Sequence, residues 1–382
     1  MATTDSPNGS GGYMRAAVRL PRAKRPLVQM VEKPAVLPKT VLLEVAAAGV
    51  CESDSRLSIK DGRDSFVMGH EIVGYAREIG ESVTGIELGA LYAVWEMVPC
   101  SKAVGASPLF LRHGLGVDGG FAPFVLVDTK RATLVRVPDS LVNKPELAAL
   151  AVDSTALVYH AVTNVAKLQP FKGKGKSNSS EGEAPRVLVC GVGGLGHQAL
   201  WLAKSYGATI FACDQYPPAR QLAKNIGAER VFTFEELKHA AQNEKEKFTV
   251  DLVVDFVGSE ASVKATKLAL QPATADNNRG TLVIVRPRAA LSGSVYDDLN
   301  RKYATHTVLE CLAVDGLTHA FRLLAEGAIE PTLQRVALED ISGILDELEE
   351  GTLLGHRVVT NFEAPEAGPP SGEPQWLVHP LE

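Results

Sequence analysis

A glycine-rich loop between two strongly apolar segments limits the fold more than any other feature of the chain. The loop reads Gly191-Val192-Gly193-Gly194-Leu195-Gly196 and follows an apolar stretch at 186–190. A segment with a helical pattern comes next, and a second apolar stretch at 208–213 ends at Asp214. Strand, G-x-G-x-x-G loop, helix, strand and acid stand in the order of a dinucleotide site. A parallel sheet built from βαβ units is therefore expected.

The same residues indicate which dinucleotide would bind. The glycines permit a tight turn and close backbone approach, and the helix N-terminus supplies N–H groups and partial positive charge for a pyrophosphate. Asp214 can accept both ribose hydroxyls but would repel a 2′-phosphate. Without this context the glycines would fit an ordinary turn equally well. We predict NAD in preference to NADP, bound by Gly191, Gly193, Gly194, Leu195, Gly196 and Asp214.

Composition limits the class of protein. The 382 residues leave room for two hydrophobic cores, and a net charge of −6 argues against a nucleic-acid partner. No apolar run reaches transmembrane length, and the first dozen residues lack the pattern of a signal peptide. Five scattered cysteines favour a reducing compartment over a disulfide framework. A cytoplasmic enzyme with no membrane partner is expected.

The pattern of expected secondary structure differs between the two halves of the chain. From residue 14 to about 137, short strands with frequent Gly and Pro are typical of an antiparallel, barrel-like module. From residue 186 onward, strands and helices alternate as in a doubly wound parallel sheet, with a sixth strand expected at 309–312. Residues 1–13 are expected to be disordered, and 363–382 to form a loose tail.

Three residues outside the glycine loop are of types that can bind zinc and are candidate ligands. Cys51 and His70 supply two of the three protein ligands that a catalytic zinc needs beside its open position. Asp153 is a candidate for the third, because an acid in an apolar helix start is costly to bury without a partner. Taken singly, each residue also fits a structural role, as a core cysteine, a hydrogen-bonded histidine or an N-cap aspartate.

Several segments, in order, resemble motifs of the zinc-dependent medium-chain alcohol dehydrogenase/reductase family. They are GVCESD at 49–54, GHE at 69–71, GESVTG at 80–85, DGGFA at 118–122 as a strand start, and DSTALVYH at 153–160. The resemblance implies an α/β fold. Its GroES-like β-barrel catalytic domain would comprise 14–155 and 313–362, and its Rossmann domain, with a doubly wound parallel sheet, 156–312.

The resemblance also implies a metal centre. Cys51, His70 and Asp153 would hold one catalytic zinc, with Glu71 near enough to approach the metal or to pair with Arg357. Relatives carry cysteine or glutamate where this chain has Asp153. Those with a second, structural zinc use four cysteines, but the corresponding positions here are Cys100, Ala103, Ala106 and Gly114. We predict no structural zinc, because one thiolate cannot hold a tetrahedral metal.

Further roles follow from the same resemblance. Asp54 would orient His70, and Ser53 would pass the substrate proton outward. Ser53, Cys51 and His70 would be the catalytic residues. Arg220 would lie near the adenosine, and Arg357 would reach the cofactor phosphates. The substrate pocket is expected at Trp95, Glu96, Phe121 and Leu157, where Glu96 suggests a polar or cationic group on the substrate.

These features predict an NAD(H)-dependent alcohol dehydrogenase or carbonyl reductase, in which hydride passes between nicotinamide C4 and a zinc-bound alcohol or carbonyl. Its partner would be a small alcohol, aldehyde or ketone, and the family implies a homodimer or homotetramer. One alternative is a zinc-free reductase of activated double bonds, against which Cys51 and His70 count. Another is a lyase, a cyclase or a binding protein that has kept the fold without redox turnover.

Overall fold

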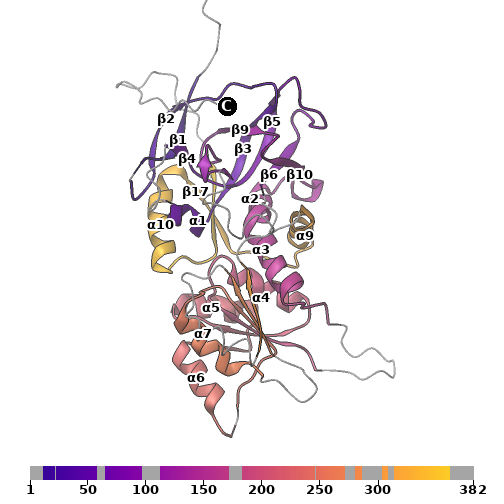
Figure 1. Cartoon of the computed structure of the whole chain (residues 1–382), viewed down its shortest axis with the longest axis vertical. Coiled ribbons are helices and arrows are strands. Elements are labelled where there is room, and N and C mark those ends of the chain that lie inside the picture. Colours follow the sequence, from indigo (N-terminus) through magenta and orange to yellow (C-terminus); the bar gives the residue numbers. More distant parts are fainter. Residues whose placement is uncertain are drawn as a thin grey trace, which may run out of the picture.

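The computed structural model describes residues 12–21, 23–57, 65–96, 112–171, 183–245, 247–271, 280–285, 303–308 and 314–361. Strand β1 (Tyr13–Arg19) begins at the residue where the expected disordered terminus was to end, so Tyr13 belongs to a strand. Residues 1–11 and the expected tail at 363–382 lie outside the described residues. Figure 1 shows two lobes joined by a run of helices.

The lower lobe is built on a parallel sheet with the strand order β13-β12-β11-β14-β15-β16. In chain order these strands are β11 (Arg186–Cys190), β12 (Thr209–Cys213), β13 (Arg230–Phe232), β14 (Leu252–Asp255), β15 (Thr281–Val285) and β16 (Ala304–Val308). The direction of winding reverses between β11 and β14, where ligands bind in doubly wound sheets. The sixth strand therefore precedes the expected position, 309–312, which lies outside the described residues.

Helices on this lobe follow its strands. They are α4 (Gly196–Ser205), α5 (Pro217–Ile226), α6 (Phe234–Gln242) and α7 (Glu260–Thr266). The strands are buried on both faces, as β11 illustrates: Leu188 and Cys190 pack in one cluster, and Val187 and Val189 in another. A continuous apolar run is what such a doubly covered strand requires.

The upper lobe is antiparallel around β3 (Thr40–Val50), which pairs with β5 (Glu71–Ile79) and β9 (Phe124–Asp128). Its other strands are β2 (Leu27–Glu32), β4 (Phe66–Val67), β6 (Leu91–Trp95), β7 (Arg112–His113), β8 (Gly116–Val117) and β10 (Thr133–Arg136). Strand β9 starts at Phe124, after the segment 118–122 at which a strand start was expected. Helix α1 (Glu52–Leu57) follows directly on β3.

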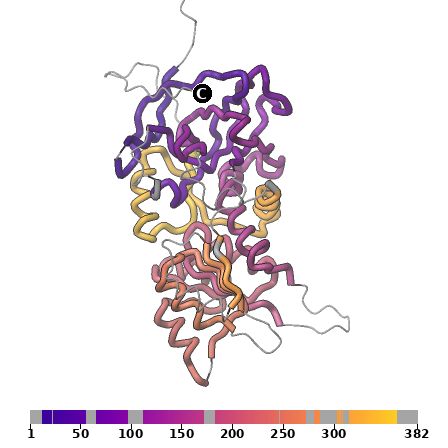
Figure 2. Tube along the Cα trace, viewed as in Figure 1, coloured from indigo at the N-terminus to yellow at the C-terminus, as the bar shows by residue number. Residues whose placement is uncertain are grey.

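The end of the described chain returns to this upper lobe. After α9 (Val314–Ala325) come β17 (Leu333–Ala337), α10 (Ile341–Glu350) and β18 (His356–Asn361). Strand β18 pairs with β3, so yellow and indigo segments meet in Figure 2. Residues near both ends of the described chain therefore build one lobe, and the strands of the parallel sheet lie between them in the sequence.

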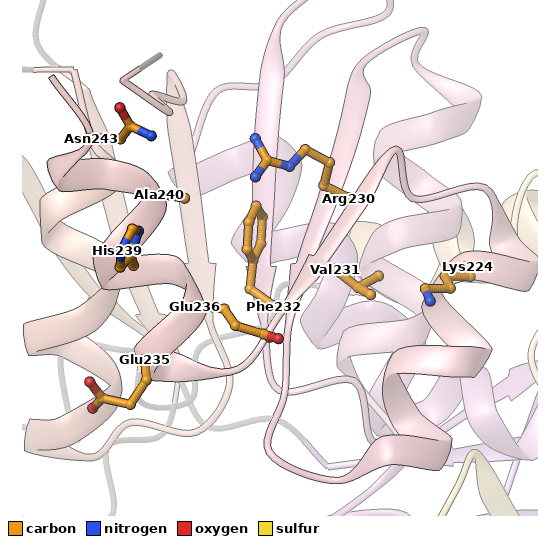
Figure 3. Close-up of a pocket in the computed structure, with 9 residues that line it drawn as sticks. All are labelled: Lys224, Arg230, Val231, Phe232, Glu235, Glu236, His239, Ala240 and Asn243. Atoms are coloured by element: carbon orange, nitrogen blue, oxygen red, sulfur yellow. The ribbon is translucent and has the colours of Figure 1, made fainter. Parts of the chain in front are cut away.

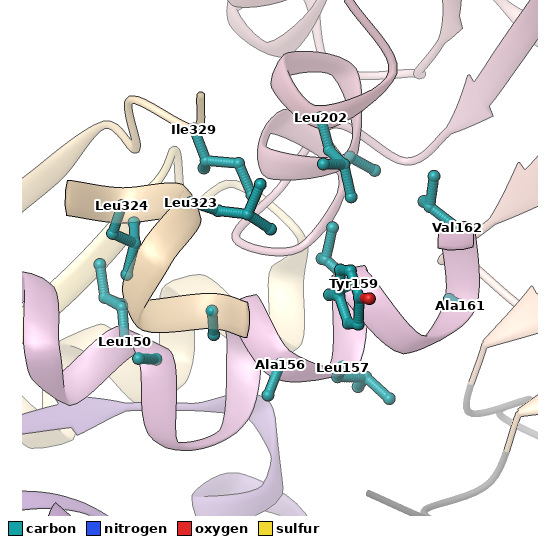
Figure 4. Packing of buried hydrophobic residues seen from close by; sticks show 14 of the residues in the cluster. Leu150, Ala156, Leu157, Tyr159, Ala161, Val162, Leu202, Leu323, Leu324 and Ile329 are labelled. Atoms are coloured by element: carbon teal, nitrogen blue, oxygen red, sulfur yellow. The ribbon is translucent and has the colours of Figure 1, made fainter. Parts of the chain in front are cut away.

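A nearly continuous helical run joins the lobes. It comprises α2 (Pro145–Leu150), the π-helical turn η3 (Ala151–Thr155), α3 (Ala156–Tyr159) and the π-helical turn η4 (His160–Val165). Figure 4 shows how apolar side chains of α3 pack against α4 and α9, with Tyr159 near the middle of the cluster. The helical run thus belongs to a core shared by both lobes. No helix in the described ranges is long and apolar enough to cross a membrane.

Candidate active site

Four ligand-type side chains meet in the upper lobe. They come from Cys51, His70, Glu71 and Asp153, and one potential ligand atom of each lies within 4.8 Å of the others. The Cys51 Sγ is 4.0 Å from Asp153 Oδ2, which is 3.5 Å from His70 Nε2. The histidine and both acids are buried, and Cys51 is half-buried. The sequence-predicted metal residues are therefore brought together.

Local backbone structure explains why these side chains converge. Cys51 directly follows β3 and Glu71 begins β5, and these neighbouring strands pair Gly49 with Glu71. A Cβ at Gly49 would lie 1.9 Å from Glu71 Oε2, so only glycine leaves room for that carboxylate. Asp153 lies in the π-helical turn η3, a local widening that is frequent at functional sites.

Asp54 holds two of the clustered residues at once. One oxygen lies 3.0 Å from His70 Nδ1, and the other accepts the Cys51 N–H at 2.9 Å. Burial lowers the pKa of His70, but the charge of Asp54 and hydrogen bonds to neighbouring groups outweigh it and leave that pKa well raised. The predicted contact between Asp54 and His70 is present.

This contact leads to a testable expectation for Asp54→Asn. The variant keeps the shape but removes the charge that orients the ring, so zinc affinity is expected to fall about 10- to 100-fold. Competition with a chromophoric chelator would measure the change. Asp346→Asn is a matched control, since Asp346 pairs with Arg25 and its side chain is 55% exposed. Equal zinc affinity in both variants would contradict the orienting role.

The glycine loop leaves β11 and enters α4. Gly191 has φ +83°, and a Cβ at Gly196 would lie 1.7 Å from the Gly191 carbonyl oxygen, so both positions require glycine. Beside Gly193 a Cβ would meet nothing within 4 Å. A tight turn with open space beside its second glycine is the arrangement that admits a pyrophosphate.

Asp214 contacts the loop directly. Its carboxylate accepts the Val192 N–H at 2.7 Å and the Tyr216 N–H at 2.8 Å. Arg220 donates to the backbone carbonyls of Asp214 and Gln215, both at 2.8 Å. The acid predicted to bind ribose is therefore fixed at the end of β12, and Arg220 supports the backbone that carries it.

Arg357 lies on β18, next to β3. It donates to the Leu354 carbonyl at 2.8 Å and lies 3.8 Å from the Glu347 carboxylate. Glu71, the residue with which Arg357 was expected to pair, is part of the metal cluster. Both roles expected for Glu71, approaching the metal and pairing with Arg357, stay predictions.

A polar contact joins the two halves of the site. Thr155, in the same π-helical turn as Asp153, donates to Gln198 Oε1 at 2.6 Å. Gln198 Nε2 in turn donates to the Gly194 carbonyl at 3.2 Å. The metal cluster and the glycine loop are thus linked through two buried side chains that sequence reasoning had missed.

Three of the residues expected in the substrate pocket are almost fully buried. Trp95, Phe121 and Leu157 are at most 3% exposed. A Cβ at Gly69 would lie only 2.5 Å from the Phe121 ring. Phe121 therefore packs under the turn that carries His70. A pocket role for these three residues stays a prediction.

The Glu96 carboxylate is hydrogen-bonded within the protein. One oxygen lies 2.7 Å from His113 Nδ1 and the other accepts the His113 N–H at 2.7 Å. The remaining ring nitrogen lies 3.1 Å from the Leu126 carbonyl oxygen, so each ring nitrogen faces an acceptor. Burial raises the pKa of Glu96, but the hydrogen bond and charge of His113 outweigh it and leave that pKa lowered. A cationic substrate group is not needed to explain Glu96.

The pair lies beside the positions at which relatives carry a structural zinc. Of these positions, Cys100, Ala103 and Ala106 lie outside the described residues, while Gly114 follows His113 directly. Glu96 precedes that undescribed segment and His113 follows it, so the pair connects its two ends. The absence of a structural zinc stays a prediction.

We expect Glu96→Gln to lower the free energy of unfolding by about 2 kcal/mol, because it weakens the acceptor of two hydrogen bonds from the buried His113. Unfolding in denaturant would measure the loss. In the double variant with His113→Gln, part of the stability should return, so the two effects are expected to be non-additive. Strict additivity would show that the two residues act independently.

A cavity of about 660 Å³ lies elsewhere, between β13 and α6 (Figure 3). It is lined by Lys224, Arg230, Val231, Phe232, Glu235, Glu236, His239, Ala240 and Asn243. None of the sequence-predicted site residues is among them. This cavity is therefore separate from the metal cluster and the glycine loop.

Two family models match the chain. Residues 37–139 match the alcohol dehydrogenase GroES-like domain, and residues 194–285 match the zinc-binding dehydrogenase domain. Together the two matches span about half of the sequence and include β3, Cys51, the His70 turn and the second half of the glycine loop. The chain belongs to the zinc-dependent medium-chain dehydrogenase/reductase family.

Whole-length comparisons agree with this family. Two alcohol dehydrogenases from Geobacillus stearothermophilus are each 28% identical over 371 residues, covering 91% of this chain and 98% and 99% of theirs. The alcohol dehydrogenase of Aeropyrum pernix is 25% identical, with a TM-score of 0.74, over 91% of this chain and 100% of that one. As a member of the family, the chain is an oxidoreductase of the alcohol dehydrogenase/reductase class.

A further solved structure shows the same fold. Acetophenone reductase from Geotrichum candidum, solved in complex with NAD, is 22% identical with a TM-score of 0.71, covering 93% of this chain and 99% of that one. The family fold thus combines a GroES-like domain with a Rossmann-type sheet, as the sequence predicted.

Proposed function

We propose that this protein is an NAD(H)-dependent alcohol dehydrogenase or carbonyl reductase with one catalytic zinc. The observation that supports this most directly is the convergence of Cys51, His70, Glu71 and Asp153 within 4.8 Å. Cys51, His70 and Asp153 would hold the metal, and Glu71 would be a nearby carboxylate able to approach it. The proposed substrate is a small alcohol, aldehyde or ketone.

The donor set fits zinc. His70 Nε2 is buried without a hydrogen-bond partner in the described part of the chain, while Nδ1 is engaged by Asp54. An imidazole held through one nitrogen, with the other directed at a thiol and a carboxylate, is a common arrangement of a zinc ligand. Sulfur, nitrogen and carboxylate oxygen all bind zinc at about 2.0–2.3 Å, so the shorter Asp153 is chemically acceptable.

Bound zinc would supply Lewis acidity toward the substrate oxygen, and bound NAD(H) would accept or donate hydride at nicotinamide C4. The protein's own residues would place these groups. Ser53 Oγ lies 3.8 Å from the Cys51 sulfur, where it can take the substrate hydroxyl proton and pass it outward. Asp54 keeps the proton of His70 on Nδ1, which leaves Nε2 available as a ligand.

Asp214 supports NAD(H) over NADP(H). Its carboxylate is fixed at the end of β12 by two backbone N–H groups, so it cannot turn away from an added 2′-phosphate without losing them. Arg220 donates to two backbone carbonyls beside it, which leaves the guanidinium partly satisfied. We propose that this pair of residues selects the unphosphorylated ribose.

The test has two parts. Fluorescence titration should show clearly tighter binding of NADH than of NADPH, and NADH should be oxidised when aldehydes and ketones are added. Tighter NADPH binding would refute the role of Asp214. A protein that binds NADH but reduces only activated double bonds, with no metal, would favour the zinc-free alternative.

A further inference from the structure

Two buried histidines contact the glycine loop. His197 lies on α4 of the parallel lobe, and His356 lies on β18 of the other lobe. Their ring centroids are 5.6 Å apart. Neither residue belongs to the metal cluster or was expected in the site, although His197 directly follows the glycine motif and His356 precedes Arg357.

His197 bridges the two lobes through both ring nitrogens. Its Nδ1 lies 2.8 Å from the Gly193 carbonyl oxygen, and its Nε2 accepts the Thr332 N–H at 3.1 Å. Because the carbonyl can only accept, Nδ1 must carry the proton, and the ring is neutral. Burial lowers the pKa of His197 to about 4, which agrees with that state.

His356 makes the reciprocal contact from the opposite lobe. Its Nε2 lies 2.6 Å from the Gly194 carbonyl oxygen and 2.7 Å from Gln198 Nε2. The ring packs closely on the loop, since a Cβ at Gly194 would lie 3.0 Å from His356 Cε1. Consecutive carbonyl groups of the loop are therefore each held by one histidine.

Holding a carbonyl also fixes the N–H on the other side of the same peptide unit. A trans peptide is planar, and its C=O and N–H point in opposite directions. The contact of His197 with the Gly193 carbonyl therefore aims the Gly194 N–H, and the contact of His356 with the Gly194 carbonyl aims the Leu195 N–H. Neither N–H has a hydrogen-bond partner among the described residues.

We propose that His197 and His356 are positioning residues that direct the Gly194 and Leu195 N–H groups at the pyrophosphate of the dinucleotide. The inference rests on the proposed function, because it needs a dinucleotide at this loop. Each ring is also attached to the opposite lobe, His197 through Thr332 and His356 through its own strand. The relative position of the lobes therefore sets the orientation of both N–H groups.

Paired substitutions test the proposal in the full-length protein. His356→Phe removes the polar contact with the Gly194 carbonyl, whereas His356→Gln retains an amide group near the position of Nε2. His197→Leu and His197→Asn form the equivalent pair for Nδ1. Isothermal titration with NADH, ADP-ribose and adenosine would be combined with zinc content and melting temperature. The first two ligands contain the pyrophosphate, and adenosine lacks it.

We expect His356→Phe and His197→Leu to weaken NADH and ADP-ribose binding each about tenfold, with adenosine binding and zinc content unchanged. The Gln and Asn variants should recover most of that loss. Equal weakening of adenosine, or no rescue, would show a merely structural role and overturn the inference. If the wild-type protein binds none of these ligands, the proposed function fails instead; if it binds NADH and His356→Phe binds equally well, only the inference fails.

Discussion

Cys51→Ser is expected to remove most of the bound zinc and to lower turnover about a thousandfold, while NADH binding is retained. A catalytic metal contributes several kcal/mol of charge stabilisation, and about 4 kcal/mol corresponds to that factor. The cofactor should still bind, because its proposed contacts with the glycine loop and Asp214 lie in the other lobe. Steady-state kinetics, NADH titration and metal analysis of one preparation would measure all three quantities.

Cys100→Ser is the matched control for this variant. Cys100 is the one cysteine in the four-position frame that relatives use for a structural zinc, and the other three positions lack a thiol. We therefore expect its substitution to leave zinc content and turnover unchanged. Loss of zinc from Cys100→Ser would reveal a second metal site, and full activity in metal-free Cys51→Ser would rule out a catalytic role for the cluster.

Stability is expected to fall steeply as the pH drops from 7.5 to 5, because two buried histidines are neutral in the folded protein. Burial lowers the pKa of His197 to about 4; burial and the nearby His197 lower that of His356 to about 3. In the unfolded chain each would titrate near 6.5, so the unfolded state binds more protons below that pH. Each histidine should lower the free energy of unfolding at pH 5 by about 2 kcal/mol relative to its value at pH 7.5.

Denaturant unfolding at several pH values would measure this slope. The stabilising contribution is complete above about pH 6.5 and is lost as the pH falls toward the folded-state values. The double variant His197→Asn with His356→Gln has neither titrating ring and should show a flatter profile over the same window. An unchanged slope in that variant would assign the acid sensitivity to other groups.

Local spacing explains which parts of the site were predictable. The glycine loop and Asp214 are specified by a short βαβ unit, in which residue types follow directly from turn geometry and strand ends. Asp153 was identifiable because an acid within an apolar helix start requires a reason to be buried. The π-helical turn that carries it could not be read from the sequence, because its residues fit a regular helix equally well.

Contacts between distant segments were not predictable. His356 and Gly194 are 162 positions apart, and their contact exists because β18 returns to β3 in the upper lobe. The pocket role expected for Glu96 stays a prediction, and its contact with His113 was missed because the two residues are 17 positions apart, on separate segments. The sixth parallel strand covers 304–308, just before the expected position, because a single apolar run does not fix strand boundaries.

The central claim is that Cys51, His70 and Asp153 form a zinc centre, and metal content tests it most directly. After dialysis against metal-free buffer, plasma emission analysis should find one zinc per chain in the wild-type protein. The Asp153→Ala variant should contain much less zinc. Wild-type protein that reduces a carbonyl with NADH while containing no stoichiometric zinc would contradict the account.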